Sequence, residues 1–389
     1  MQIERRRLLE AALLAAFASP MNPSFAQSAA GRQVVVIGAG IIGASLAYHL
    51  ARAGAQVTVL EQSAPSSGAT SNSFAWLNAM SKSPQPYYEL NLLGILGWHR
   101  LQNELQGRLP VQWGGTVQWA KPGDNIEAIM DRLKRQQAWG YAVRTIEEEE
   151  MLALVPGLVP GAVALAYFGA MEGTVDPAHA TQVLLREAQA LGAKVEYPVA
   201  VIGFAKNGAQ VVEVQTEQGK LQVTDVVLAA GLGCSKLAAN LGCKVPLTSS
   251  EGLLAHTEPE ASLLERIVLA PGATIKQNPE GGIVAGESFA ATVGIKPTRE
   301  FGEAVLKKAS EFLPQLRSTK LSNVTLGHRV LPEDSFPIVG HLPGYANAYV
   351  AALHSGMTMA PIIGQLGTME LLNGIRSPLL DSFRPERFN

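Results

Sequence analysis

The sequence carries little charge and almost no cysteine. Of its 389 residues, 16% are charged, against about 25% in an average soluble chain. The 31 basic and 33 acidic residues nearly cancel, leaving a formal net charge of −2. This balance excludes a global positive field that would hold nucleic acid by its phosphates. Two cysteines, Cys234 and Cys243, cannot form a disulfide framework or a four-cysteine metal site, so we predict no metal; whether they pair with each other stays open.

Glycine, by contrast, is abundant. The 38 glycines are about one residue in ten, above the ~7% average, without a collagen-like period. The apolar content of 47% excludes a disordered chain of low hydrophobicity. The length suits two lobes with separate cores. Glycine supplies backbone freedom, so its positions indicate where the chain must turn tightly or approach a ligand.

Residues 1–26 are predicted to be an export signal. Three arginines, Arg5 to Arg7, precede an apolar run over residues 8–18, and small residues lead up to Ala26. Paired arginines before such a run are typical of the twin-arginine route, which would make the mature protein periplasmic. The run is too short to span a bilayer and Glu10 interrupts it. The alternative is a soluble N-terminal helix on a cytoplasmic protein.

Alternating strands and helices mark both ends of the remaining chain, and β-rich material lies between them. Asp176 and Pro177 are typical of a helix start and Gly192 of a helix end. The expected elements are strands over residues 33–37, 56–60, 111–119, 195–204, 210–215, 225–230 and 349–353, and helices over residues 42–53, 88–105, 125–139, 177–191, 299–312 and 358–372. This pattern favours an α/β fold: a doubly wound, Rossmann-like domain with an inserted second lobe of α+β type and an antiparallel sheet.

A dinucleotide fingerprint follows the first strand. Gly38, Gly40 and Gly43 have the spacing G-x-G-x-x-G and open a helix, and Glu61 ends the next strand 18 residues later. The glycines permit the tight turn, the approach of pyrophosphate and the packing of helix on strand. The helix N-terminus attracts the pyrophosphate, and Glu61 can accept hydrogen bonds from a ribose diol.

Beyond the fingerprint, several segments lie in a characteristic order. These are Ser66-Ser67-Gly68-Ala69-Thr70-Ser71-Asn72, Glu172-Gly173-Thr174-Val175-Asp176-Pro177, the R-x-x-P-x-D-x-x-P-x-x-G element from Arg329 to Gly340, and His354-Ser355-Gly356-Met357-Thr358-Met359-Ala360-Pro361. On these motifs, the chain from Val34 to Leu372 resembles the FAD-dependent D-amino acid oxidase and dehydrogenase superfamily, which includes glycine oxidase and sarcosine oxidase.

The resemblance implies FAD as cofactor. The residues assigned to it are Gly38, Gly40, Ile41, Ile42, Gly43, Glu61, Gln62, Ser67, Gly68, Ala69, Thr70, Val201, Ala230, Gly231, Ser355, Gly356, Met357 and Thr358. Sarcosine-oxidase relatives attach flavin through a cysteine just before the proline-aspartate element, where this chain has His328-Arg329. We therefore expect non-covalent FAD. The implied division gives residues 31–90, 171–246 and 322–385 to the FAD-binding domain, and residues 91–170 and 247–321 to the substrate domain.

The resemblance also implies the chemistry. Arg329 begins the late element, where the family binds the substrate carboxylate, and a guanidinium fits a planar carboxylate through two hydrogen bonds. The expected reaction is hydride transfer from the C–N carbon of an amino acid or amine to flavin N5, giving an imine that hydrolyses in water. His354 is a weaker catalytic candidate, and Trp76 a candidate pocket residue beside the tyrosines Tyr87, Tyr88 and Tyr345.

Alternatives remain open at this point. The same fold could oxidise a 2-hydroxy acid, for which a base would be needed, or bind flavin as a non-catalytic partner. The electron acceptor could be oxygen, a quinone or a cytochrome, and a peripheral membrane contact is possible. Nucleic acid is not an expected partner.

Overall fold

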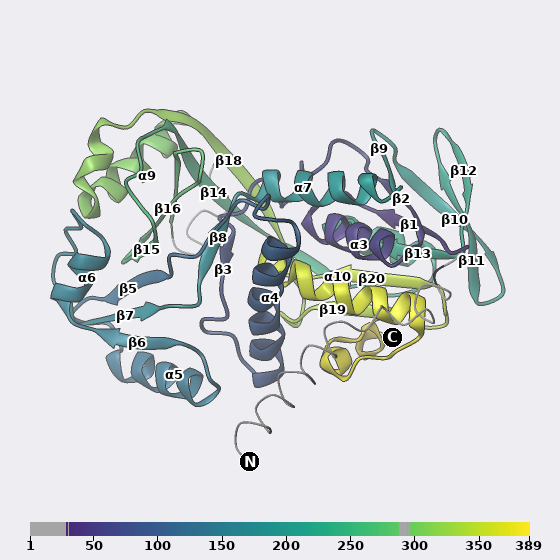
Figure 1. Cartoon of the computed structure of the whole chain (residues 1–389), viewed down its shortest axis with the longest axis horizontal. Coiled ribbons are helices and arrows are strands. Elements are labelled where there is room, and N and C mark those ends of the chain that lie inside the picture. Colours follow the sequence, from purple (N-terminus) through teal and green to yellow (C-terminus); the bar gives the residue numbers. More distant parts are fainter. Residues whose placement is uncertain (1–28, 30, 288–293, 295) are drawn as a thin grey trace, which may run out of the picture.

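The computed structural model describes residues 29, 31–287, 294 and 296–389, which form two lobes side by side (Figure 1). The predicted export signal over residues 1–26 lies outside the described residues. The lobe on the right of Figure 1 contains the chain's first strand and its last long helix; the lobe on the left is built from segments inserted between them.

A six-stranded sheet organises the first lobe. Its strand order is β19 (Ile338–His341), β20 (Ala348–Ala352), β13 (Asp225–Leu228), β1 (Gln33–Ile37), β2 (Gln56–Leu60) and β9 (Lys194–Glu196). All neighbours are parallel except β19 and β20. The order places β1 at the centre, so the turn that follows β1 opens at the middle of the sheet's carboxyl edge, the usual place for a dinucleotide.

Both faces of this sheet are covered, which explains why its strands are almost continuously apolar. Val34 and Val36 of β1 pack into a core with the helices, whereas Val35 and Ile37 pack into another core on the opposite face. The helices are α3 (Ile41–Arg52), α4 (Gln85–Glu104), α7 (Pro177–Ala190) and α10 (Gly356–Asn373). The other face carries α8 (Cys234–Asn240) and a small antiparallel sheet of β10 (Val201–Asn207), β11 (Gln210–Thr216) and β12 (Gly219–Gln222).

An eight-stranded sheet organises the second lobe. Its order is β18 (Leu321–Pro332), β14 (Leu247–Pro259), β17 (Gly282–Gly286), β16 (Ala273–Gln277), β15 (Ile267–Ala270), β5 (Thr116–Ala120), β7 (Leu165–Gly169) and β6 (Val143–Ile146). All neighbours are antiparallel except β15 and β5. The helices of this lobe are α5 (Ile126–Ala138), α6 (Glu148–Leu154) and α9 (Arg299–Phe312).

A three-stranded sheet, β3 (Trp76–Leu77), β8 (Gly173–Val175) and β4 (Val111–Gln112), lies where the two lobes meet. Short 3-10 helices complete the fold: η1 (Gly231–Gly233), η2 (Pro314–Ser318), η3 (Pro378–Phe383) and η4 (Pro385–Phe388). The sequence-based expectation of a Rossmann-like lobe with an inserted antiparallel-sheet lobe is therefore confirmed.

Two predicted strands are wrong in extent. The strand expected over residues 111–119 is divided into β4 and β5, because Gly115 takes the left-handed φ of +76°. The strand expected over residues 195–204 is divided into β9 and β10, which belong to different sheets, with a cis peptide bond at Tyr197-Pro198 between them.

Two of the predicted domain boundaries fall within or at the start of a secondary-structure element. The division after residue 90 falls inside α4, whose buried Trp98 and Leu101 pack into the core of the first lobe. The division after residue 321 falls at the start of β18, which pairs along its length with β14 in the second lobe.

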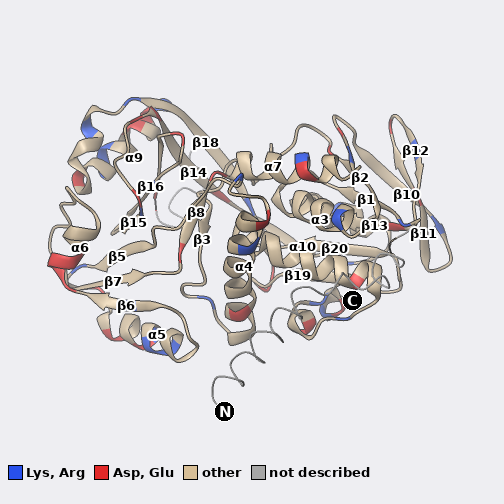
Figure 2. Ribbon diagram, viewed as in Figure 1, with Lys and Arg blue, Asp and Glu red and all other residues tan. Residues whose placement is uncertain are grey.

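Charges of both signs are spread over both lobes (Figure 2). Among the helices of the described chain, none has the length and apolar character needed to cross a membrane.

Candidate active site and cofactor cleft

A cavity of about 1150 Å³ lies between the two sheets and takes its lining from both lobes. Every residue that the sequence assigned to FAD except Gly43 lines it, and so do Arg329 and His354. The fingerprint, the loop after Glu61, the element that begins at Arg329 and the turn at His354 thus contribute to one space, whereas the segment from Glu172 to Pro177 does not line it. A cavity of this size has room for a dinucleotide and a small substrate together.

The fingerprint glycines form a turn that no side chain would fit. Gly38 has a φ of +106°, and a Cβ there would lie 2.5 Å from the carbonyl oxygen of Ala229 on the neighbouring strand end. A Cβ at Gly43 would lie 1.9 Å from the carbonyl oxygen of Gly38. Gly43 therefore does not contact the cavity; it lets α3 pack closely on the turn that does.

Glu61 and Thr70 fix the groups around this turn. The Glu61 carboxylate accepts hydrogen bonds from the backbone N–H of Ala39 (3.0 Å) and of Ser63 (2.9 Å), which hold it at the end of β2. The Thr70 hydroxyl oxygen accepts a bond from the N–H of Ile41 (3.1 Å) at the start of α3. The loop after β2 is thereby tied to the helix N-terminus. The glycine cradle and the carboxylate beside it fit the pyrophosphate and ribose of FAD.

The paired strands β14 and β18 carry Arg329 toward the same cavity. Gly252 and Gly327 are directly opposite each other in this pair, and without side chains they let Arg329 and Asn72, respectively, pack closely against the strands. The Arg329 guanidinium lies over Gly252, where a Cβ would be 2.5 Å from Nη2, and Nη1 donates to the Ser250 hydroxyl (3.3 Å) and to the Glu251 carbonyl. Burial lowers the pKa of Arg329 below its usual value, yet a guanidinium remains charged at any physiological pH.

A polar cluster surrounds the N-terminus of α10. Ser355 takes a φ of +57°, and its hydroxyl oxygen lies 2.9 Å from Lys82 Nζ, 3.1 Å from the Tyr87 hydroxyl and 3.3 Å from His354 Nδ1. Burial lowers the pKa of Lys82 to about 8 and that of His354 to about 4, the nearby charges of Lys82 and Arg329 adding to the second effect. His354 is therefore neutral at pH 7 and a weak base.

A buried carboxyl group lies where the lobes meet. Glu172 is fully buried, and its oxygens accept hydrogen bonds from Trp76 Nε1 (2.6 Å) and the Tyr141 hydroxyl (2.8 Å). Burial raises the pKa of Glu172 to about 7, although hydrogen bonds from Thr116, Tyr141 and Trp76 and the charge of Lys82 act in the opposite direction. Trp76 lines the cavity, so this carboxyl group fixes the ring that forms part of the wall.

Sequence reasoning missed most of the cavity wall outside the cofactor motifs. Lys82, Arg132 and Tyr167 line it, together with Met80 and Gln118, and none of them belongs to a recognisable motif. Of the candidate aromatic residues, Trp76 lines the cavity, whereas Tyr87 and Tyr88 are buried in core clusters and the Tyr345 hydroxyl bonds the Leu241 carbonyl.

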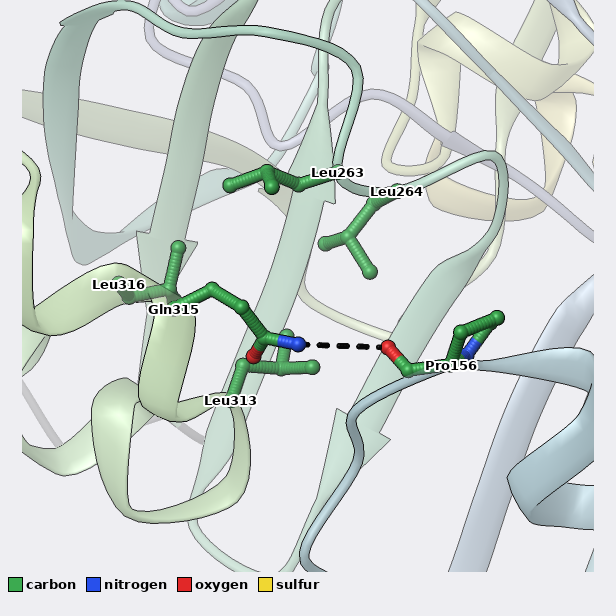
Figure 3. A pocket seen from close by; sticks show the side chains of 6 residues that line it. All are labelled: Pro156, Leu263, Leu264, Leu313, Gln315 and Leu316. Carbon is green, nitrogen blue, oxygen red and sulfur yellow. Dashed lines mark hydrogen bonds between the residues drawn. The ribbon is translucent and has the colours of Figure 1, made fainter.

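Another hollow, in the second lobe, has no comparable chemistry. It measures about 10 Å³, roughly the space of one water molecule, and four leucines, Pro156 and Gln315 line it (Figure 3). The two cysteines are buried free thiols, and neither lines the large cavity. No group of three or more His, Cys, Asp or Glu side chains in the described residues could hold a metal ion.

A dinucleotide cradle facing a guanidinium across one cavity defines the class of two-lobed, dinucleotide-dependent oxidoreductases. More particularly, the chain belongs to the DAO family of FAD-dependent oxidoreductases, whose family model matches residues 33–368. It is accordingly an FAD-dependent enzyme, and the alternative of a non-catalytic flavin-binding partner is not supported.

Individual relatives agree with this assignment. Glycine oxidase from Pseudomonas aeruginosa is 27% identical over 359 residues, covering 90% of this chain and 96% of the relative. The 4-methylaminobutanoate oxidase (formaldehyde-forming) of Paenarthrobacter nicotinovorans is 32% identical over 219 residues, which are 56% of this chain and 27% of that protein. The fold also matches the crystal structure of glycine oxidase from Geobacillus kaustophilus with a TM-score of 0.82 and 22% identity, covering 91% of this chain and 98% of that one.

Proposed function

We propose that the protein oxidises the C–N bond of a small amino acid or amine that carries a carboxylate. The product is an imine, which water hydrolyses to a keto acid or aldehyde and ammonia or an amine. The oxidising power of this reaction would be supplied by bound FAD as the hydride acceptor. The two curated relatives support this choice, since both are named as oxidases of substrates that contain an amine and a carboxylate.

The observation that carries the proposal is the position of Arg329. Its guanidinium lies over Gly252, on the wall of the cavity that also contains the nucleotide cradle. A guanidinium binds a carboxylate through two parallel hydrogen bonds and fixes its plane. The substrate carbon next to that carboxylate would then be held in one orientation, which is the main contribution a protein makes to hydride transfer.

The remaining residues shape the site around this contact. The Trp76 ring, which Glu172 holds in place, forms part of the cavity wall beside the loop that follows β2. Ser355 and Gly356 also line the cavity, so the N-terminus of α10 lies at it. A helix N-terminus favours negative charge nearby. It would therefore stabilise the extra charge of a reduced cofactor ring bound there.

The weak basicity of His354 favours amines over 2-hydroxy acids as substrates. Oxidation of a hydroxyl group requires removal of its proton by a base, and a group with a pKa of about 4 performs this poorly near pH 7. An amine can instead bind as the free base, with its lone pair available.

Anaerobic mixing of the flavin-loaded protein with candidate substrates tests the proposal. The panel contains glycine, N-methylglycine, D- and L-amino acids and the corresponding 2-hydroxy acids. Loss of the visible flavin absorbance with an amine, and not with its hydroxy analogue, supports the proposal. Reduction by hydroxy acids alone, or by no member of the panel, refutes it. Repeating the reaction with oxygen and with a quinone analogue identifies the acceptor.

We also propose that residues 1–26 direct export by the twin-arginine route, since Arg5 to Arg7 precede the apolar run. Fractionation of cells expressing the full chain and an Arg5→Lys/Arg6→Lys variant tests this. Release of the wild type alone into the periplasm supports it; equal cytoplasmic retention of both refutes it.

A further inference from the structure

Arg132 lies on the cavity wall formed by α5, in the second lobe. One helical turn later, Gln136 donates a hydrogen bond from Nε2 to the carbonyl oxygen of Ala79 (3.0 Å). Residues four apart share a helix face. This face of α5 therefore rests on the segment that contains Ala79, and Arg132 lines the same cavity as Met80 and Lys82, which follow Ala79 in the chain.

The sheet presents a continuous row of side chains leading to Arg132. Tyr167 of β7 is directly opposite Gln118 of β5, Gln118 is paired with Leu269 of β15, and Leu269 with Thr274 of β16. All four line the cavity, because residues in register on neighbouring strands share a face of the sheet. The polar end of the row, Tyr167 and Gln118, is the end at Arg132.

The Arg132 guanidinium is incompletely satisfied. Nη2 is 3.3 Å from the Tyr167 hydroxyl, and Nε is buried without a hydrogen-bond partner. No carboxylate among the described residues forms an ion pair with it. Asp124 also lines the cavity, but its carboxylate accepts a bond from the backbone N–H of Lys121 (2.9 Å). A buried donor without a partner is costly, so a ligand that accepts from Arg132 would relieve that cost.

The Tyr167 hydroxyl is a suitable second donor at this place. Burial raises the pKa of Tyr167 to about 12, although the charge of Arg132 acts in the opposite direction. The hydroxyl therefore keeps its proton at neutral pH. It can accept from Arg132 and donate to an anion at the same time.

We propose that Arg132, with Tyr167 and Gln118, forms a second anion-binding site in the cavity, so that the substrate carries a second carboxylate remote from the one held by Arg329. The substrate class is then an acidic amino acid or an N-(carboxyalkyl) amino acid. This inference rests on the proposed function for the role of Arg329. The cation and the hydrogen-bond donors at the remote end select a carboxylate over the neutral amide of the same shape.

Ligand binding tests this site without turnover. The oxidised, FAD-loaded protein is titrated with succinate, glutarate and adipate and with their monoamides, and binding is followed through the visible absorption of the flavin. For at least one chain length, the dicarboxylate should bind about 10- to 100-fold more tightly than its monoamide, as expected for hydrogen bonds to a charged group. Equal affinity of acid and amide at every length overturns the proposal.

Substitutions assign the preference to Arg132. Arg132→Met should weaken the binding of the dicarboxylate alone, so that the ratio of the affinities for the dicarboxylate and its monoamide falls to within about threefold. Arg132→Lys should retain part of the preference for the dicarboxylate. Lys134→Met, an exposed position on the same helix, should leave the ratio unchanged. A ratio that survives in both Arg132→Met and Arg132→Gln overturns the proposal.

The two hypotheses fail in different ways. If dicarboxylates bind preferentially but no amine or amino acid reduces the flavin, the proposed function fails and the second site stands. If N-methylglycine and N-(carboxymethyl)glycine reduce the flavin with equal KM, and Arg132→Met changes neither value, the second site fails and the proposed function stands.

Discussion

The two lobes build their halves of the cavity in different ways. In the first lobe, backbone and glycines make the site: a Cβ at Gly38 or Gly43 would collide with a carbonyl oxygen. In the second lobe, side chains on separate strands and on one helix make it, and Arg329, Gln118, Tyr167 and Arg132 come from four elements. A site built from backbone and glycines suits a cofactor whose phosphates are always the same. A site built from side chains can change with the substrate, because single residues can be exchanged while the sheet is retained.

The largest effect is expected from a substitution in the half of the cavity that backbone and glycines form. Gly43→Ala should abolish FAD retention and strongly destabilise the protein, because the new Cβ would lie 1.9 Å from the Gly38 carbonyl oxygen and α3 would have to move. The flavin-to-protein ratio after purification and the urea midpoint measure this. Gly282→Ala is the control, since its nearest contact would be an ordinary 3.7 Å. Full FAD content in Gly43→Ala would show that the cradle is not what binds the cofactor.

The next effect concerns the side-chain half. Arg329→Met should retain FAD and the fold but lower kcat/KM by roughly 30- to 5,000-fold, since removing one member of a desolvated charge pair costs about 2–5 kcal/mol. Steady-state kinetics with the best substrate of the panel measure it. Arg317→Met, an exposed position outside the cavity, should behave as wild type. An unchanged kcat/KM in Arg329→Met would contradict the carboxylate role.

Glu172 tests the junction between the two halves through pH. Its pKa is raised from 4.5 to about 7. Below pH 4.5 the Glu172 carboxyl is protonated in both the folded and the unfolded protein. As the pH rises from 4.5 toward 7, the carboxyl ionises only in the unfolded chain, so the free energy of unfolding decreases. The loss should total about 3 kcal/mol.

Glu172→Gln removes this ionisation. Denaturant unfolding between pH 4.5 and 8 should therefore show the free energy of unfolding of the wild type falling by about 3 kcal/mol relative to the variant. Glu217→Gln, in an exposed turn, should follow the wild type. Parallel curves for wild type and Glu172→Gln would show that the carboxyl titrates alike in both states.

The smallest effect is expected from a substitution of Gly252, which lies beneath the Arg329 guanidinium. Gly252→Ala places a Cβ 2.5 Å from Arg329 Nη2, so the guanidinium must move while the nucleotide cradle is untouched. We expect kcat/KM to fall about tenfold with unchanged FAD content, which corresponds to about 1.4 kcal/mol. Kinetics and the flavin spectrum check this. A loss of FAD instead would show that the two halves of the cavity are not independent.

Local patterns predicted much of the first lobe. The strands β1 and β2 begin and end where their apolar runs do, and α7 is capped by Asp176, which accepts a bond from the N–H of His179 (2.7 Å). The division of residues 195–204 between two sheets could not be predicted, because one apolar run of this length fits one strand or two. Apolar periodicity does not specify which sheet a strand joins.

The candidate site divides in the same way. The spacing of Gly38, Gly40, Gly43 and Glu61 predicted the nucleotide cradle because the turn, the helix start and the strand end are close in sequence. Arg132 gave no such signal, and Glu172 stood in a quoted segment without an assigned role, because their partners lie far away in the chain: Tyr167 is 35 positions from Arg132, and Tyr141 is 31 positions from Glu172. A motif can be read only where neighbours in the chain are also neighbours in space.

The amino-acid pattern alone predicted the cofactor cradle and the Rossmann-like alternation, since both follow from local backbone requirements, whereas Arg329 was predicted through the resemblance of its motif to a family. The tertiary structure decided which side chains face that cradle. Strand register across the second sheet brings Gln118 and Tyr167 onto the cavity, the packing of α5 brings Arg132 there, and Gly252 of β14 leaves room for Arg329. Register depends on long-range pairing and on the burial of whole sheet faces, so it is a property of the folded molecule as a whole.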